Sequence, residues 1–136
     1  MGYRRTPLAV DEWYHCYTRG IDQRSTFEDM HDFERFEELL YLANDVKAVD
    51  RNLYGNIAHG DIFVRQRTHP LVSIGAYCLM PNHYHVLLRE IEEGGISKFM
   101  QKIGTGYVMY FNAKNERVGN LFIKPFRSKH IGTDRY

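Results

Sequence analysis

The segment from 71 to 90 constrains the fold more than any other part of the chain. It reads LVSIGAYCLM, then Pro-Asn, then HYHVLLRE, so a turn dipeptide separates two β-rich runs. Pro81 cannot donate a hydrogen bond to a central ladder, and both Pro and Asn are common turn residues. We therefore predict a β-hairpin with its tight turn at Met80–Asn82. Such a hairpin implies an antiparallel sheet.

The remaining periodic segments alternate between strand and helix. Alternating aromatic and polar residues predict strands, and apolar residues three or four apart predict helices. The order strand, helix, strand, strand, helix, strand is that of a ferredoxin-like α+β fold, with helices packed on a central antiparallel sheet. The predicted elements outside the hairpin are a strand at 13–18, a helix at 31–46, a helix at 96–112 and an edge strand at 121–131.

Local signals refine some of these boundaries. Asp29 or Asp32 can cap the first helix. Residues 45–70 combine weak periodicity with Gly and Pro, so we expect a helix end followed by a loop or an irregular hairpin. The last five residues read GTDRY, which is typical of a new helix start with Thr133 or Asp134 as its N-cap.

Composition excludes several classes of protein. The 136 residues suit one domain (1–136), and 43% hydrophobic with 26% charged residues is ordinary for a globular chain. A net charge of +1 excludes a uniformly basic nucleic-acid binder, although basic residues gather toward the C-terminus, where they favour a phosphate backbone. No apolar run reaches the roughly 18 residues of a membrane span, and no signal peptide is visible. The expected compartment is the cytoplasm.

The two cysteines, Cys16 and Cys78, have neither zinc-type nor redox-type spacing. Both lie in apolar, strand-like runs, and free cysteine is commonly buried. We interpret both as reduced residues of the core.

His83 and His85 interrupt the apolar run of the hairpin. Side chains two apart on a strand point to the same face, about 6.6 Å apart along it, so both imidazoles can converge on one ion while Tyr84 faces the core. Two imidazoles make an incomplete metal site, and imidazole favours transition metals over Mg²⁺. The same spacing also recurs by chance in histidines bonded to the backbone. His15 and His130 lie in strand-like segments that could neighbour the hairpin, and we interpret both as structural hydrogen-bonding residues.

Four stretches, in the same order along the chain, resemble the REP-associated tyrosine transposases of the HUH single-tyrosine (insertion-sequence-200-like) superfamily. The first strand of the family and its loop resemble the stretch YHCYTRGIDQRSTF. The HUH strand pair resembles AYCLMPNHYHVLL, and the helix that follows it resembles GGISKFMQKIGTGYVMYFN. GNLFIKPFRSKHIGTDRY resembles the next strand segment, with Lys-Pro-Phe-Arg at 124–127 where the family usually has Gly-Arg-Phe-Lys. The resemblance covers nearly the whole chain.

This resemblance implies a chemistry. A divalent ion, Mg²⁺ or Mn²⁺, would be held by His83 and His85 and would polarise a phosphodiester of single-stranded DNA that carries hairpins. A tyrosine hydroxyl would attack the phosphorus and leave a 5′-phosphotyrosine and a free 3′-OH, and rejoining would reverse the step.

Basic residues near loops and strand ends are candidate DNA contacts, although each can also be a solvated surface charge. Exposed aromatic side chains could stack on bases. The basic candidates are Arg4, Arg5, Arg19, Arg127 and Lys129.

The nucleophile is where the sequence departs from the family. Family members carry the nucleophilic tyrosine on a later helix, in a Tyr-Ile-x-x-Asn-Pro pattern, and that helix also supplies the third metal ligand. The pattern does not occur in these 136 residues, and Tyr136 corresponds to an earlier tyrosine near the start of that helix. Tyr107 and Tyr110 fit the apolar face of the helix at 96–112, so we interpret both as core residues. Relative to the family, we expect a C-terminally truncated domain whose catalytic residue is unknown.

Two functions stay open at this point. One is that of an HUH-type tyrosine transposase, in a truncated form. The other is that of a non-catalytic module that binds single-stranded DNA or hairpins on the same scaffold, and a purely structural ferredoxin-like domain is a third alternative. Loss of the nucleophile helix would expose the sheet surface that it covers, so we expect an apolar patch or a homodimer contact there.

Overall fold

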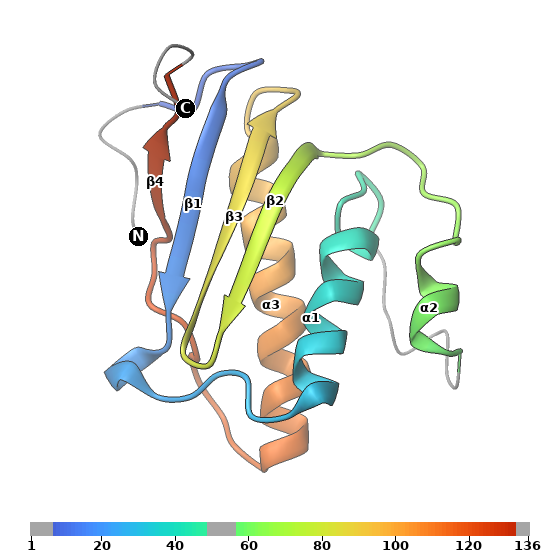
Figure 1. Cartoon of the computed structure of the whole chain (residues 1–136), viewed down its shortest axis with the longest axis vertical. Coiled ribbons are helices and arrows are strands. Elements are labelled where there is room, and N and C mark those ends of the chain that lie inside the picture. The colour runs from blue at the N-terminus through green and yellow to red at the C-terminus, as the bar shows by residue number, and fades with distance from the viewer. Residues whose placement is uncertain (1–6, 49–56, 133–136) are drawn as a thin grey trace.

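The structure is a computed structural model, which describes residues 7–48 and 57–132. Its four strands form one sheet in the order β2-β3-β1-β4, and every neighbouring pair is antiparallel (Figure 1). This arrangement confirms the predicted ferredoxin-like α+β fold. The elements are β1 (Trp13–Arg19), a 3-10 turn η1 (Ile21–Gln23), α1 (Met30–Leu42), α2 (His59–Ile62), β2 (Val72–Met80), β3 (His83–Glu90), α3 (Gly95–Asn115) and β4 (Arg127–His130).

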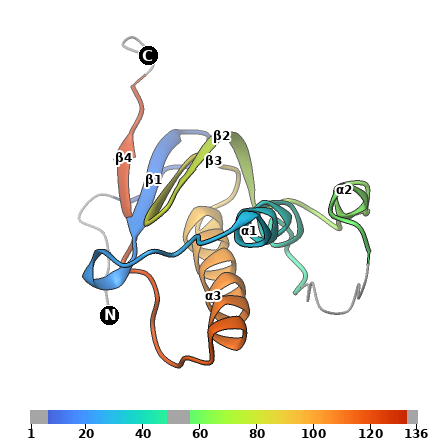
Figure 2. The same ribbon diagram turned by 60° about the horizontal axis from the view of Figure 1, so that its bottom comes forward.

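The two long helices, α1 and α3, lie on the same side of the sheet (Figures 1 and 2). Successive side chains of a strand point to opposite faces, and on β1 and β3 every second side chain is buried. The buried side chains belong to one core that the helices complete, and the ring centroids of Phe36 on α1 and Tyr84 on β3 lie 4.6 Å apart. No helix in the part of the chain that the structure describes covers the other face of the sheet.

Helix α1 begins within one residue of the predicted start and ends at Leu42, four residues before the predicted end at residue 46. Asp29 is its N-cap, and the carboxylate accepts a backbone N–H three residues on at 3.1 Å. The helix ends at Leu42 because Asn44 bonds to the start of β2 instead. The Asn44 side chain accepts from the N–H groups of Leu71 and Val72 at 2.8 and 3.0 Å and donates to the Val72 carbonyl at 2.9 Å.

The last strand is shorter than predicted. Only Arg127–His130 forms β4, whereas residues 121–126 cross the end of β1 as an irregular segment with one isolated bridge at Phe122. Phe122 is buried in the core, which draws the segment away from the edge of the sheet. Pro125 also lacks the N–H that a ladder needs.

The interpretation of both cysteines as core residues is wrong for one of them. Cys16 is buried on β1, but Cys78 is exposed. The reason is that β2 is an edge strand and Cys78 pairs with His85, on the face that the helices leave uncovered. An apolar run in the sequence does not distinguish a central strand from an edge strand.

Several predictions concern connecting segments. Where we expected a loop or an irregular hairpin, the described residues include the one-turn helix α2, anchored by the buried Ile62. Residues 49–56, Thr133 and Asp134 lie outside the described residues. Within the described ranges, no helix is long and apolar enough to cross a membrane.

Helix α3 is capped by the end of β3. Its N-cap, Gly94, has a φ of 84°, a conformation that favours glycine. The buried Glu90 carboxylate accepts the Gly94 N–H at 3.0 Å and the Ile96 N–H at 2.6 Å, and a negative charge suits a helix N-terminus. Gly95 is required as well, because a Cβ there would lie 2.5 Å from the Leu71 carbonyl oxygen.

We expect Glu90→Ala to lower the free energy of unfolding by about 2–3 kcal/mol, because the buried Ile96 N–H and the more exposed Gly94 N–H lose a charged acceptor. Glu90→Gln keeps one acceptor oxygen, so its free energy of unfolding should fall by roughly half as much as that of Glu90→Ala. Urea unfolding followed by far-UV circular dichroism measures both. The exposed Glu93→Ala in the same turn is the matched control and should stay within about 0.5 kcal/mol of the parent. Equal losses for Glu90→Ala and Glu93→Ala would contradict the capping role.

Candidate functional site

The face of the sheet that the helices leave uncovered carries the candidate metal ligands and those candidate DNA contacts that the structure describes. Directly opposed residues of antiparallel strands point to the same face. Three rows of such residues define this surface, which we call the open face. The rows are Lys129–His15–Leu87–Ala76, Arg127–Tyr17–His85–Cys78 and Arg19–His83–Met80.

The two histidines of the hairpin share the open face. Tyr84 between them is 2% exposed and lies in the core, as the alternation predicts. The ring centroids of His83 and His85 are 5.1 Å apart. His83 Nδ1 lies 2.7 Å from the side-chain oxygen of Asn82, which only accepts, so in the neutral imidazole Nδ1 carries the proton and Nε2 keeps its lone pair.

His85 is bonded to a histidine of the neighbouring strand. Its Nδ1 lies 2.7 Å from the Nε2 of His15, with the ring centroids 4.9 Å apart. The ring of Tyr17 stacks on His85 at 5.6 Å. Burial, followed by the proximity of His15 and His83, lowers the pKa of His85 below its ordinary value. A lower pKa favours the neutral ring, which is the form that binds metals.

His130, by contrast, lies away from this surface. It pairs with the buried Tyr14, and its Nε2 lies 2.7 Å from a carboxylate oxygen of Glu12. The structural hydrogen bond that we predicted for His130 is present. His15 also forms a hydrogen bond, but its partner is His85, a predicted metal ligand.

The loop after β1 holds the turn that carries the histidines. The Pro81 carbonyl accepts the N–H groups of Thr26 and Phe27 at 2.8 and 3.1 Å, and the Asn82 carbonyl accepts the Gly20 N–H at 2.9 Å. Gly20 is needed at this close approach, because a Cβ would lie 2.5 Å from a backbone oxygen of the same loop. Long-range contacts thus fix the start of β3 and with it the position of His83.

Two imidazole nitrogens on one face fit part of a metal site. His83 presents an unprotonated Nε2, and His85 has only Nε2 left, because its Nδ1 is bonded to His15. Within residues 7–48 and 57–132, no group of three or more His, Cys, Asp or Glu side chains could hold a metal. The donors present therefore match the two-imidazole part of the predicted site, and an ion bound there would keep open positions for water or phosphate oxygens.

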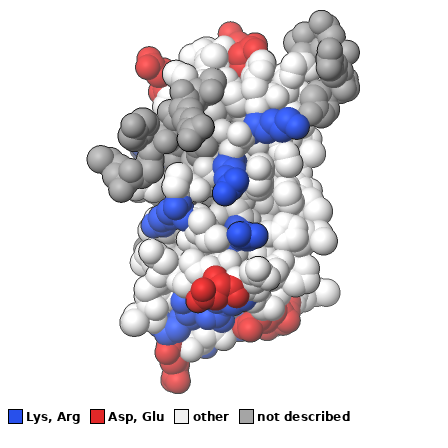
Figure 3. All heavy atoms as spheres, turned by 90° about the vertical axis from the view of Figure 1, so that its left-hand side faces the viewer, with Lys and Arg blue, Asp and Glu red and all other residues white. Residues whose placement is uncertain are grey.

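A groove of about 560 Å³ runs beside the histidines. Figure 3 shows Lys and Arg side chains spread along the β4 side of the molecule, with acidic side chains mainly toward its two ends. Lys129 lies one row beyond the groove, opposite His15, whereas Arg4 and Arg5 lie outside the described residues. The lining residues that matter for the site are Tyr17, Arg19, His83, His85 and Arg127.

The tyrosines of α3 lie on the other side of the sheet from the histidines. Tyr107 is fully buried, its hydroxyl donates to a backbone carbonyl of the β1–α1 loop, and burial raises its pKa far above the ordinary range. The Tyr110 hydroxyl donates to Asp32 at 2.8 Å, and burial together with this carboxylate raises the pKa of Tyr110 to about 12. Both are packing residues, as predicted. Tyr136 lies outside the described residues.

Tyr17 is the one tyrosine that the described part of the chain presents on the open face. We did not single it out from the sequence. The signal was nevertheless present, because the two-residue period of β1 places Tyr17 on the same face as His15 and Arg19.

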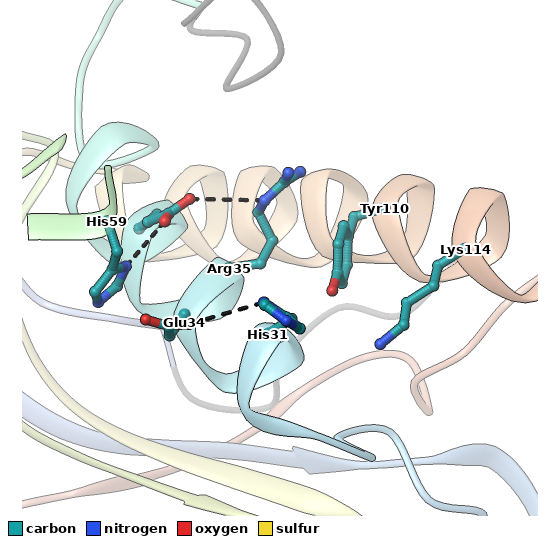
Figure 4. Close-up of a pocket in the computed structure, with 7 residues that line it drawn as sticks. His31, Glu34, Arg35, His59, Tyr110 and Lys114 are labelled. Atoms are coloured by element: carbon teal, nitrogen blue, oxygen red, sulfur yellow. Dashed lines mark hydrogen bonds and ion pairs between the residues drawn. The ribbon is translucent and has the colours of Figure 1, made fainter. Parts of the chain in front are cut away.

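A second hollow, of about 450 Å³, lies on the helix side of the molecule (Figure 4). Its charged groups pair with one another. His59 Nδ1 lies 2.9 Å and Arg35 Nε 3.6 Å from the Glu38 carboxylate, and Lys114 Nζ lies 2.8 Å from Asp32. These pairs join α2 to α1 and α1 to α3, so we interpret them as part of helix packing.

Comparison with known proteins supports the fold. No family model and no curated protein matches the sequence. A solved structure described as a REP-associated tyrosine transposase bound to a REP hairpin aligns with 99% of this chain at a TM-score of 0.59 and 12% identity. The chain spans 65% of the length of that protein. At this identity the likeness shows that the two proteins share a fold.

Proposed function

We propose that the open face binds hairpin-bearing single-stranded DNA, with a divalent ion, Mg²⁺ or Mn²⁺, held by His83 and His85. One observation carries the proposal: the sheet register places both histidines on the same uncovered surface as Arg19, Arg127 and Lys129. The shared fold with a transposase that was solved bound to a REP hairpin supports the same ligand.

The side chains of the open face have distinct tasks in this proposal. Arg19, Arg127 and Lys129 neutralise phosphates, which supplies most of the affinity for a nucleic acid. Tyr17 offers a ring face on which a base can stack. His83 and His85 place their Nε2 atoms beside the groove. A divalent ion held by His83 and His85 would supply Lewis-acid polarisation of a phosphodiester oxygen.

Cleavage and rejoining of DNA through a 5′-phosphotyrosine is the second function that we consider. The histidine pair and the transposase-like fold favour it. Its nucleophile cannot be Tyr107 or Tyr110, because both hydroxyls are engaged on the helix side. The reaction would need Tyr17 or a tyrosine outside the described residues.

We expect wild-type protein to bind Mn²⁺ in isothermal titration calorimetry and the variant with His83→Ala and His85→Ala to show no measurable binding. The reason is that the variant loses both imidazole donors. His130→Ala is the matched control, since His130 is exposed and lies on the opposite face. Unchanged Mn²⁺ affinity in the double variant would rule out the histidine pair as the metal site.

We expect replacement of Arg19, Arg127 and Lys129 by Gln to weaken binding of a hairpin-bearing single strand. Each lost phosphate contact should reduce the slope of log affinity against log salt concentration by about 0.7, or roughly 2 for all three. Fluorescence anisotropy across a salt series measures the slope. Lys98→Gln, an exposed cation on α3, should leave it unchanged. If the triple variant keeps the wild-type slope, DNA does not contact this face.

A covalent-adduct assay separates binding from cleavage. Incubated with Mn²⁺ and a labelled hairpin-bearing strand, the 136-residue chain should bind DNA and form no adduct through Tyr107 or Tyr110, because the α3 tyrosines face away from the groove. Denaturing gel electrophoresis detects an adduct directly. An adduct that disappears in Tyr17→Phe or in Tyr136→Phe would identify the nucleophile and establish the transposase reaction instead.

A further inference from the structure

The contact between His15 and His85 restricts where protons can sit. His15 Nε2 and His85 Nδ1 are 2.7 Å apart, which is a hydrogen-bond distance and requires one donor and one acceptor. A neutral imidazole has one N–H and one lone pair, so two arrangements are open. In one, His15 donates and His85 carries its remaining proton on Nε2. In the other, His85 donates from Nδ1 and its Nε2 is unprotonated.

Metal binding selects the second arrangement. The Nδ1 of His85 is occupied by His15, so Nε2 is the nitrogen that can reach an ion, and a ligating nitrogen must be unprotonated. The proton must then lie on Nδ1 and point at His15. His83 has the same tautomer, because its Nδ1 donates to Asn82. Both histidines thus offer Nε2 to the same surface.

We propose that His15 is a positioning residue for His85: its Nε2 accepts the Nδ1–H, which holds the ring in place and keeps the tautomer that can bind a metal. This inference rests on the proposed function, because it requires His85 to be a ligand. Acceptors behind ligating histidines commonly fix the tautomer and the ring orientation in metal proteins.

The choice of acceptor fits a phosphate ligand. Such acceptors are often carboxylates, but the three rows of the open face contain no Asp or Glu. A neutral imidazole accepts the same hydrogen bond without adding a negative charge. The face therefore keeps the positive potential of Arg127 and Lys129, which attracts a phosphate backbone.

Packing supports the same role. The rings of His15 and His85 lie edge to edge with an interplanar angle of 29°, and the Tyr17 ring lies 5.0 Å from the first ring and 5.6 Å from the second. The three rings therefore restrain one another. A side chain that only fills this space would maintain the packing and lose the hydrogen bond, and this difference provides the test.

The test compares His15→Gln, whose side-chain oxygen can take the place of Nε2 as an acceptor, with His15→Leu, which cannot accept. We expect His15→Leu to weaken Mn²⁺ binding about 10- to 100-fold in titration calorimetry, and His15→Gln to stay within roughly threefold of wild type. Long-range ¹H–¹⁵N spectra of metal-free protein should show the proton of His85 on Nδ1 in wild type and in His15→Gln. Far-UV circular dichroism checks that each variant folds.

The outcomes distinguish this inference from the proposed function. If wild-type protein binds no Mn²⁺, the proposed metal site fails and the inference fails with it. If wild type binds Mn²⁺ and folded His15→Leu binds it equally well, only the positioning role is overturned. If His15→Gln loses Mn²⁺ binding as completely as His85→Ala, His15 is itself a metal ligand. That result would also overturn the positioning role. A His85 proton on Nε2 in the wild-type spectrum has the same consequence, even if no His15 variant folds.

Discussion

The two-residue period of β3 is the constraint on which the rest of the structure depends. It sends Tyr84, Val86 and Leu88 into the core and leaves His83 and His85 on the opposite face. Because β3 is a central strand, its buried side chains lie in the same hydrophobic core as the buried side chains of α1 and α3. A shift of one residue in the register would move two imidazoles into that core and expose the apolar set, at a large cost in free energy.

The two ends of β3 are secured by different contacts. At its start, backbone groups of the β1–α1 loop bond to Pro81 and Asn82 and so locate His83. At its end, the Glu90 carboxylate caps α3 and joins the sheet to the helix layer. A strand restrained at both ends can hold side chains at its start in one orientation, which a metal ligand requires. Stability and site geometry are thus connected through one strand.

The sequence predicted most of the fold, and its errors have physical causes. The hairpin, both long helices and the Asp29 cap depend on local periodicity or local hydrogen bonds, which a sequence shows directly. The end of α1 depends on Asn44 bonding to β2, 27 and 28 residues away. The exposure of Cys78 depends on β2 being an edge strand and on helices covering only the other face of the sheet. Such facts follow from strand order and long-range packing, which local patterns do not encode.

By itself, the sequence determined that His83 and His85 share one face of a strand and that Tyr84 takes the other, because side-chain alternation is a property of the local backbone. Only the tertiary structure decided that helices cover the Tyr84 side, that Arg127 and Lys129 lie on the same face as the histidines, and that His15 bonds to His85. These relations join strands that are far apart in the chain. Their register is set by the burial of a common core, and burial depends on the whole fold at once.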